Sequence, residues 1–327
     1  MSAGGLVHSC ATILCADSPK EHASANADAN DRLKHGAGLS ALGQSRPYAR
    51  PERMACSRRK RSIVDTNPSR CFSRANITLG EIGLRLQFVG TGDAFGSGGR
   101  FNTCFRVERA EGDFLIDCGA SSLIALWKSG IEPNSIRTIF VTHLHGDHFG
   151  GLPFFVLDGQ FYSRRQTPLT LVGPPGFKDR LARAMEVFFP GSSTAKRKFE
   201  TIIHEVAPGS VSEIDGITLT AVEMRHSCGS PALGLRFQVA GKAIAYSGDG
   251  EWSDALIELG RGADLFIAEA LSFDKKISQH LDYASIRDNA ARIGAKKIMI
   301  THFGPDMLAR LGDAEHEAAE DGLIVQI

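Results

Sequence analysis

The segment Phe140–Gly151, with the sequence FVTHLHGDHFGG, carries three histidines and one aspartate within six consecutive residues. Imidazole nitrogens and carboxylate oxygens are ligands of zinc, which usually takes four of them. His143 and His145 are two residues apart, so in an extended segment their side chains lie on the same side of the chain. We expect this pair to hold one metal ion.

The same segment can reach a second ion. Gly146 lets the chain turn sharply, so that Asp147 and His148 face a position next to the first ion. Three imidazoles and a carboxylate this close together bring no packing advantage, and the imidazoles repel one another once they are protonated. We therefore interpret the segment as part of a site for two metal ions.

Three residues farther along the chain can complete such a site. His226, Asp249 and His302 each follow an apolar stretch, as His143 does. A single histidine at a strand end is more often a packed or capping residue than a ligand, and Asp249 alone could be a turn residue. Given the dense segment, we expect His226 to complete the ligand set of the first ion and His302 that of the second, and we expect Asp249 to bridge the two ions. Water between two ions about 3.5–4 Å apart loses a proton near neutral pH and becomes a nucleophile.

The apolar stretches around these residues predict the elements that position them. Strands are expected at LRLQFVGTG, FRVERA, DFLIDCG, TIFVTH, LTLVGP, ETIIHEV, GITLTAVEMRH, ALGLRFQVAG, KAIAYSGD, DLFIAEA, KKIMITH and GLIVQI, and helices around residues 121–130, 151–162, 176–189, 252–259 and 283–293. This mixture predicts an α/β protein in which helices flank two mixed sheets, a four-layer αββα sandwich. If the strands that end in the expected ligands share a sheet, their carboxyl ends converge on one rim.

Residues 1–80 differ in composition from the rest of the chain. They are rich in Ala, Ser, Asn, Asp and Arg and show neither helical nor strand periodicity. We expect a disordered extension here and one folded domain over residues 81–327. The basic cluster Ser57–Arg61 could contact RNA or act as a targeting signal, although a solvated charge run, or sequence upstream of a start at Met54, explains it better.

The composition also limits the partners and the compartment. Lys and Arg (37) balance Asp and Glu (37), so the bulk charge gives no sign of a polyanionic partner. The seven cysteines include no C-x-x-C pair, which argues against a disulfide framework and a structural zinc knuckle. No apolar run has the length of a membrane helix, and no secretory signal opens the sequence. We expect a cytoplasmic protein that does not contact a membrane.

The segment THLHGDHFGG resembles the signature of the metallo-β-lactamase fold hydrolases, and His226, Asp249 and His302 follow in that family's order. Other motifs resemble its phosphodiesterase branch, which contains tRNase Z. These motifs are FVGTGDAFGSGGRFNTCF, LIDCG, HSCGSPALGLRF, YSGD, AEALSF, QHLDY and ITHFGPDM. The resemblance covers residues 84–327 and implies a metallo-β-lactamase-like hydrolase domain over residues 81–327. It is more specific for the superfamily than for the substrate.

The resemblance implies a metal-binding role for each matching residue. His143, His145 and His226 would bind one ion, Asp147, His148 and His302 the other, and Asp249 would bridge the two. Both ions are expected to be zinc, although manganese or iron could bind the same histidine and carboxylate ligands. Asp117 would support the site without binding metal.

The resemblance also implies roles in catalysis, which we expect for Asp147, His280 and Glu269. His280 would contact the scissile phosphate and help to protonate the leaving oxygen, and Glu269 would orient it. Without the resemblance, an ordinary residue at the start of a helix explains His280 equally well.

Two departures from tRNase Z concern the substrate. Between LGLRF and YSGD this chain has only a short hairpin, where the resembling enzymes insert a long arm that grips tRNA. It also has Gly234–Leu235 where that family usually has Gly-Tyr, and its DAFGSGGR loop is open enough for a smaller ligand. We therefore expect a phosphodiesterase in which the metal-bridging hydroxide attacks a small phosphodiester, such as a cyclic nucleotide or an oligonucleotide end.

Other functions stay open. A tRNA 3′-processing endonuclease of the tRNase Z type, or a thioester or lactam hydrolase on the same fold, would use the same site. A non-catalytic metal-binding or nucleic-acid-binding protein fits less well, because all seven ligands are present and a pseudoenzyme usually loses one. Homodimers are usual in the resembling family, but the sequence alone does not show one.

Overall fold

The computed structural model of the chain describes residues 83–327, which form two seven-stranded sheets. The strands of the first sheet, in spatial order, are β14 (Ile324–Gln326), β1 (Arg85–Gly90), β2 (Cys104–Glu108), β3 (Asp113–Ile116), β4 (Ile136–Phe140), β5 (Leu169–Gly173) and β6 (Thr201–Glu205). Neighbours from β14 to β3 are antiparallel, and neighbours from β3 to β6 are parallel. The sheet is therefore mixed, and its last strand in the sequence pairs with its first.

The second sheet has the same kind of layout. In spatial order its strands are β13 (Glu317–Ala318), β12 (Ile298–Thr301), β11 (Leu265–Glu269), β10 (Lys242–Tyr246), β9 (Ala232–Val239), β8 (Ile217–Met224) and β7 (Val211–Ile214). Neighbours from β7 to β10 are antiparallel, and neighbours from β10 to β13 are parallel. The short strands β7 and β13 were not predicted, because neither has an apolar run.

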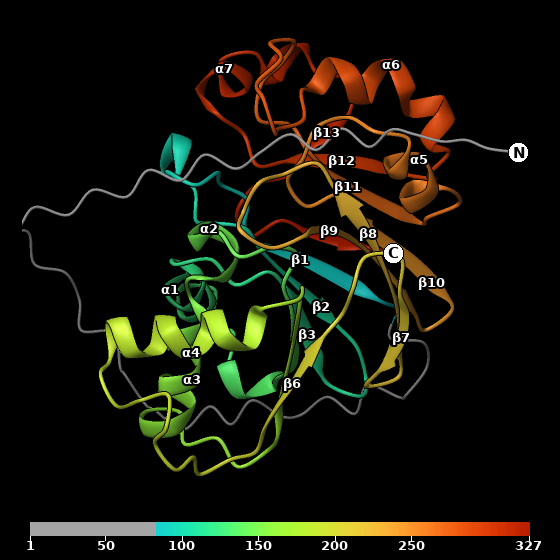
Figure 1. Cartoon of the computed structure of the whole chain (residues 1–327). Coiled ribbons are helices and arrows are strands. Elements are labelled where there is room, and N and C mark those ends of the chain that lie inside the picture. The colour runs from blue at the N-terminus through green and yellow to red at the C-terminus, as the bar shows by residue number, and fades with distance from the viewer. Residues whose placement is uncertain (1–82) are drawn as a thin grey trace, which may run out of the picture. The chain divides into compact units, whose positions relative to one another are not determined.

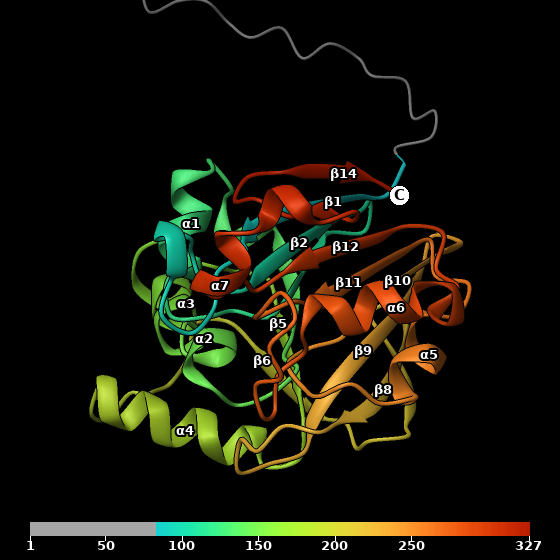
Figure 2. The same ribbon diagram turned by 90° about the horizontal axis from the view of Figure 1, so that it is seen from above.

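Helices cover the outer face of each sheet. They are α1 (Ser122–Lys128), α2 (Gly146–Phe149), α3 (Leu152–Phe161), α4 (Phe177–Phe188), α5 (Ala255–Gly260), α6 (Tyr283–Ile293) and α7 (Pro305–Leu308), with 3-10 turns at Ser97–Gly99, Pro133–Ser135 and Leu311–Asp313. Seen from above, α1 to α4 lie on one side of the strands and α5 and α6 on the other (Figures 1 and 2). The predicted four-layer αββα sandwich is confirmed.

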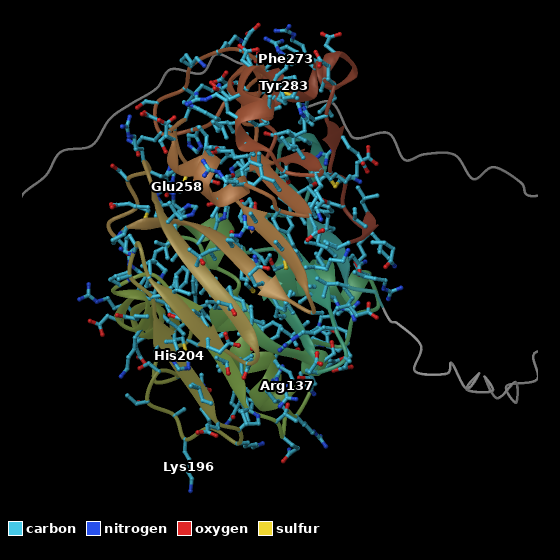
Figure 3. All side chains as sticks on the ribbon, turned by 90° about the vertical axis from the view of Figure 1, so that its right-hand side faces the viewer. Arg137, Lys196, His204, Glu258, Phe273 and Tyr283 are labelled. Carbon is cyan, nitrogen blue, oxygen red and sulfur yellow. The ribbon has the colours of Figure 1, made fainter. Side chains whose placement is uncertain are left out.

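Three apolar layers hold these elements together. Between the sheets, Phe105 packs on Tyr246, and Phe237 packs on Phe140, with ring centroids 5.0 and 5.1 Å apart. One outer layer joins α1, α3 and α4 to the first sheet, and the other joins α5, α6 and α7 to the second. In the latter, the rings of Phe273 and Tyr283, labelled in Figure 3, lie 5.1 Å apart. Burying both faces of both sheets leaves the strand ends as the places for polar chemistry.

The strands that precede the expected ligands do not share a sheet, because β4 belongs to the first sheet and β8, β10 and β12 to the second. The alternation of apolar residues tells which face of a strand is buried, and it does not tell which strands pair.

The predicted extension over residues 1–80, with its basic cluster Ser57–Arg61, lies outside the described residues, so the boundary near residue 80 stays a prediction. Within residues 83–327, no helix is long and apolar enough to cross a membrane.

Candidate metal centre

The dense histidine segment lies at the carboxyl end of β4. His145 precedes the one-turn helix α2, which contains Asp147 and His148. The chain turns at Gly146 as expected, but the turn does not depend on a conformation that only glycine adopts. Gly146 has no left-handed backbone and begins helix α2, and this helix turns the chain. Close approach of the backbone requires glycine instead at Gly119 and Gly151, where a Cβ would lie 2.0 Å from the carbonyl oxygen of Asp147 and 2.2 Å from that of Gly119.

The other expected ligands follow strands of the second sheet. His226 comes shortly after β8, Asp249 shortly after β10, and His302 directly after β12. Because β8, β10 and β12 run in one direction, their carboxyl ends lie along one edge of that sheet. This edge meets the end of β4, and the structure thereby brings all seven expected ligands into two adjoining clusters.

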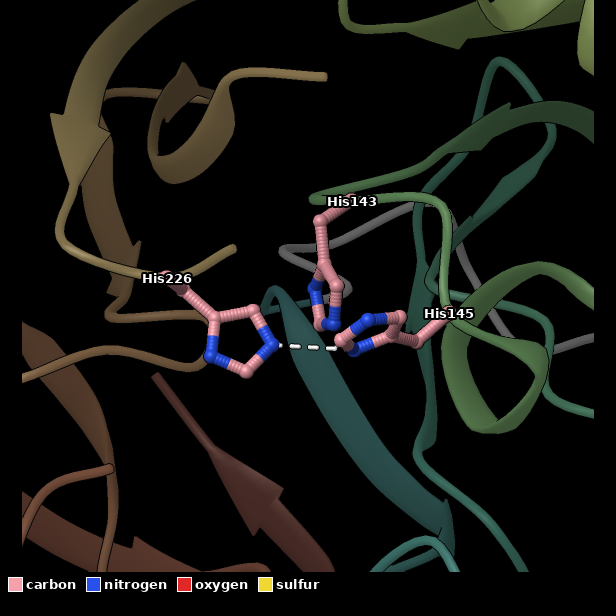
Figure 4. Close-up of side chains that lie close together, drawn as sticks. All are labelled: His143, His145 and His226. Atoms are coloured by element: carbon pink, nitrogen blue, oxygen red, sulfur yellow. Dashed lines mark hydrogen bonds between the residues drawn. The ribbon is translucent and has the colours of Figure 1, made fainter. Parts of the chain in front are cut away.

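The histidine cluster consists of His143, His145 and His226 (Figure 4). One ring nitrogen from each residue lies within 4.8 Å of the others. Nε2 of His226 is 2.9 Å from Nδ1 of His145, the contact drawn as a dashed line in the figure. His143 is buried, whereas His145 and His226 are half-buried, so this cluster is open to solvent on one side.

The carboxylate cluster consists of Asp147, His148, Asp249 and His302, and all four side chains are buried. Oδ2 of Asp249 lies 3.3 Å from Nε2 of His148 and 3.4 Å from Nε2 of His302. The same oxygen lies 3.9 Å from Nε2 of His143 in the histidine cluster. Asp249 therefore stands between the two clusters, where a bridging ligand must be.

Hydrogen bonds to Nδ1 decide which ring nitrogen four of the five cluster histidines turn toward the clusters. Nδ1 of His143 lies 3.1 Å from Oγ1 of Thr142, and Nδ1 of His148 lies 2.7 Å from Oδ2 of Asp117. Nδ1 of His226 lies 2.8 Å from the carbonyl oxygen of Gln279, and Nδ1 of His302 lies 3.1 Å from Oγ1 of Thr103. The Nε2 atoms are left for the clusters, as in histidines that bind metals. Nε2 of His143 and His148 and Oδ1 of Asp249 are buried without a hydrogen-bond partner. Buried polar atoms are seldom left so, and divalent metal ions would satisfy them.

The charges around the clusters also favour a cation. Burial lowers the pKa of His143, His145 and His226, which keeps their lone pairs free to bind a metal. Burial also lowers the pKa of His148, but the carboxylates of Asp249 and Asp147 raise it more, so that it stands well above its usual value. Negative charge is thus in excess in the carboxylate cluster, and the residues present fit divalent metal ions.

The expected pair of His280 and Glu269 lies beside the carboxylate cluster. Nδ1 of His280 is 2.5 Å from Oε1 of Glu269 at the end of β11, and 4.0 Å from Oδ2 of Asp249. Burial lowers the pKa of His280, but the hydrogen bond from its ring to Glu269 and the charge of that carboxylate raise it above its usual value. The protonated imidazole is therefore favoured, and the other ring nitrogen, Nε2, remains available to a ligand.

A cavity of about 240 Å³, called here the site cavity, opens over the carboxylate cluster. It is lined by Asp93, Ala94, Phe95, His145, Asp147, Asp249, Leu271, His280 and His302. A larger hollow of about 550 Å³ is lined by His226, Arg225, Glu223 and Glu251 among others. The site cavity is the place for chemistry, because residues of both clusters and His280 line it.

Several residues that orient the site were missed by the sequence analysis. Thr103 holds His302, and the carbonyl group of Gln279 holds His226. A threonine without a neighbouring ligand and a backbone carbonyl leave no signal in a single sequence. Thr142 is different, because it directly precedes His143, as Thr301 precedes His302, and this repeated pair could have drawn attention to it.

Comparison with known proteins gives a consistent family. A family model described as "Anti-Pycsar protein Apyc1" matches residues 84–323. Ribonuclease Z of Methanothermobacter thermautotrophicus is 28% identical over 270 residues, which cover 67% of this chain and 86% of that protein. Ribonuclease Z of Bacillus velezensis is 26% identical over 298 residues, which cover 72% of this chain and 93% of that protein.

Solved structures agree with these relatives. The short form of human tRNase Z matches with a TM-score of 0.61 and 26% identity, over 74% of this chain and 99% of that one. The metallo-β-lactamase fold protein YhfI of Bacillus subtilis matches with a TM-score of 0.62 and 18% identity, over 75% of this chain and 100% of that one. The expected metallo-β-lactamase fold and the likeness to tRNase Z are both confirmed.

Proposed function

Because this chain belongs to the Anti-Pycsar protein Apyc1 family and is a metal-dependent hydrolase, we propose that it cleaves a small phosphodiester, such as a cyclic nucleotide or an oligonucleotide end. Action on phosphodiester bonds agrees with its ribonuclease Z relatives. The restriction to a small substrate rests on one observation, the connection between β9 and β10.

That connection is a hairpin of minimal length. Ala240 and Gly241 alone join the two strands, both with a left-handed backbone, as two-residue hairpin turns require. The arm by which tRNase Z enzymes of the resembling kind grip tRNA is therefore missing at this place. The site cavity of about 240 Å³ also lies below the roughly 300–1,000 Å³ of pockets that enclose drug-sized ligands, which agrees with a small substrate.

In this proposal each cluster would hold one divalent ion. His143, His145 and His226 would hold the first, Asp147, His148 and His302 would hold the second, and Asp249 lies where it could serve both. Zinc binds such sets of histidine and carboxylate ligands, and manganese or iron can bind them in its place. Ions bound there would lower the pKa of water and stabilise charge on the phosphate oxygens. His280, held by Glu269 through Nδ1, donates a proton from Nε2 to the leaving oxygen.

Processing of tRNA 3′ ends is the second candidate. It is favoured by the ribonuclease Z relatives, of which this chain covers 86% and 93%, and by the match to 99% of human tRNase Z. Both candidates use the same ions and the same acid, so they differ in what surrounds the site and not in its chemistry.

A substrate panel separates these functions. Zinc-loaded and manganese-loaded full-length chain would be given bis(p-nitrophenyl) phosphate, nucleoside 3′,5′-cyclic phosphates, a short oligonucleotide, a pre-tRNA, a thioester and a β-lactam, with Asp249→Ala as the blank. We expect the small diesters to be cleaved and the blank to be inactive. Cleavage of pre-tRNA without small diesters would establish the second candidate, and cleavage of the thioester or lactam alone would refute both.

A homodimer is the proposed assembly. Ile124, Trp127, Phe161, Tyr162 and Phe188 are exposed on or beside α1, α3 and α4, and the rings of Trp127 and Tyr162 pack together at 5.6 Å. Exposed apolar patches of this kind often mark interfaces. We expect sedimentation to give twice the mass of the chain, and the double change Phe161→Glu and Tyr162→Glu to give the single mass. Val211→Glu, on the exposed strand β7, is the control that should leave the dimer intact.

A further inference from the structure

Phe95 is an aromatic side chain with no packing role in the described part of the chain. It is 94% exposed, the largest fraction among the large apolar side chains that residues 83–327 expose. At the same time it lines the site cavity, together with His280, His302 and Asp249. An aromatic ring that is exposed to solvent and also lines the site cavity is placed to contact a ligand bound there.

The loop that carries Phe95 is held in one conformation. Asp93 is almost fully buried, and its carboxylate accepts hydrogen bonds from the backbone N–H of Ser97 (2.8 Å), the hydroxyl of Ser97 (2.7 Å) and the backbone N–H of Phe95 (3.2 Å). Gly96, with φ of +66°, reverses the chain directly after the ring. The ring therefore projects from a rigid turn and needs little ordering when it meets a ligand.

A distant residue fixes both ends of this loop. The carboxylate of Asp321 accepts hydrogen bonds from the backbone N–H and the hydroxyl of Thr91, at 2.9 and 2.7 Å, and from the backbone N–H of Phe101 at 2.8 Å. The N–H of His302 donates in turn to the carbonyl oxygen of Thr91 at 3.1 Å. Through Thr91, the loop that carries Phe95 is thus tied to a residue of the carboxylate cluster.

We propose that Phe95 stacks on the base of a nucleotide whose phosphodiester lies in the site cavity. This inference rests on the proposed function and assigns to it a residue that favours diesters carrying a planar base over diesters without one. Phe95 lines the site cavity beside the carboxylate cluster, so a base attached to a diester bound over that cluster is within reach of the ring. An aromatic face accepts any base, since every base offers a π-face, and no hydrogen-bonding side chain is needed for this selection.

The first test compares substrates with and without a base. Metal-loaded chain is given nucleoside 3′,5′-cyclic phosphates with each of the four bases and the matching 1-O-methylribose 3′,5′-cyclic phosphate. The measured quantity is the ratio of kcat/KM with a base to kcat/KM without one. Stacking is worth about 1–3 kcal/mol per base, so Phe95→Ala should lower the ratio roughly 5- to 150-fold, through KM. Phe95→Trp should keep the ratio, Phe95→Leu should lose most of it, and Val211→Ala is the surface control.

The inference is overturned if Phe95→Ala leaves the ratio unchanged or if Phe95→Leu restores it fully, because an apolar side chain without a π-face would then suffice. A binding measurement separates this failure from a failure of the proposed function. In Phe95→Trp, the added indole fluorescence should be quenched saturably by nucleoside 5′-monophosphates and not by ribose 5-phosphate, after subtraction of the parent signal. Base-dependent quenching without turnover of any diester would refute the phosphodiesterase and support the stacking. Absence of such quenching refutes the stacking.

Discussion

At the scale of single residues, His280 is the side chain whose role can be isolated from metal binding. It lies outside both ligand sets but within 4.0 Å of Asp249. If it protonates the leaving oxygen, His280→Ala should lower kcat about 10²- to 10⁴-fold, the usual contribution of a general acid. Metal content, measured by atomic emission, should stay at the level of the parent chain. A loss of metal together with the loss of rate would instead make His280 a ligand.

Glu269 supplies the companion variant. Its carboxylate accepts the hydrogen bond from Nδ1 of His280 and a second bond, 2.8 Å long, from the backbone N–H of Gly250. Glu269→Gln keeps the shape but removes the charge that favours protonated His280. We expect a smaller loss of kcat than for His280→Ala, and no further loss in the double variant, since the two residues act as one unit.

Asp117 is predicted to control the affinity for metal. It follows β3, carries a left-handed backbone with φ of +61°, and its Oδ2 lies 2.7 Å from Nδ1 of His148. Asparagine tolerates this backbone, so Asp117→Asn removes the charge without forcing a rearrangement. Such supporting partners are worth about 10- to 100-fold in metal affinity, and a chelator competition should show a loss of that size. An unchanged affinity would contradict this role.

The residues that could be predicted from the sequence are those with several titratable neighbours close by in the chain. For this reason the sequence indicates metal ligands at His143, His145, Asp147 and His148. A site with these four ligands needs others, which favours the same role for His226 and His302 far along the chain. Thr103 and Gln279 could not be found, because their contacts depend on how distant loops meet. The place of Phe95 at the site could not be predicted either, because the exposure of a side chain is a property of the folded chain.

At the scale of elements, nearly all the long strands and helices were predicted, whereas their pairing was not. Apolar runs before His143, His226, Asp249 and His302 correctly marked strands, and glycines marked their ends. The strands belong to two sheets, however, since parallel pairing is set by the crossover helices and not by the strand's own pattern. The convergence of the ligands survives because both sheets end at the same edge of the sandwich.

Arg165 shows how one side chain joins several elements. It is almost fully buried between the rings of Phe155 and Phe199, and its Nη2 donates to the carbonyl oxygens of Pro133 and Ile136 at 2.7 and 2.8 Å. Lysine cannot reproduce this fork of donors. Arg165→Lys should therefore lower the free energy of unfolding by about 1–3 kcal/mol, the cost of a buried carbonyl left without a partner.

Urea unfolding measures that change, and the neighbouring residue provides the control. Arg164 is exposed, so Arg164→Lys should shift the free energy of unfolding by less than about 0.5 kcal/mol. A similar small shift in Arg165→Lys would mean that the two carbonyl groups find other donors.

At the scale of the whole molecule, the candidate metal centre lies where two similar halves meet. Each half is a mixed sheet with helices on its outer face, and neither half alone carries a full ligand set. The first half supplies His143, His145, Asp147 and His148, and the second supplies His226, Asp249 and His302. Each proposed ion would thus link the two sheets, in addition to any part it takes in catalysis.

Removal of metal should therefore destabilise the entire sandwich. Without ions, Oδ1 of Asp249 and Nε2 of His143 and His148 remain buried without hydrogen-bond partners. Metal at about 1,000 times its Kd would add about 4 kcal/mol of stability, so a chelator should lower the unfolding midpoint by roughly 8–16 °C. Zinc or manganese should restore it, and Asp249→Ala should respond far less to either treatment. If the chelator removes all metal and the midpoint does not move, the ions do not link the two halves, and their place is in catalysis alone.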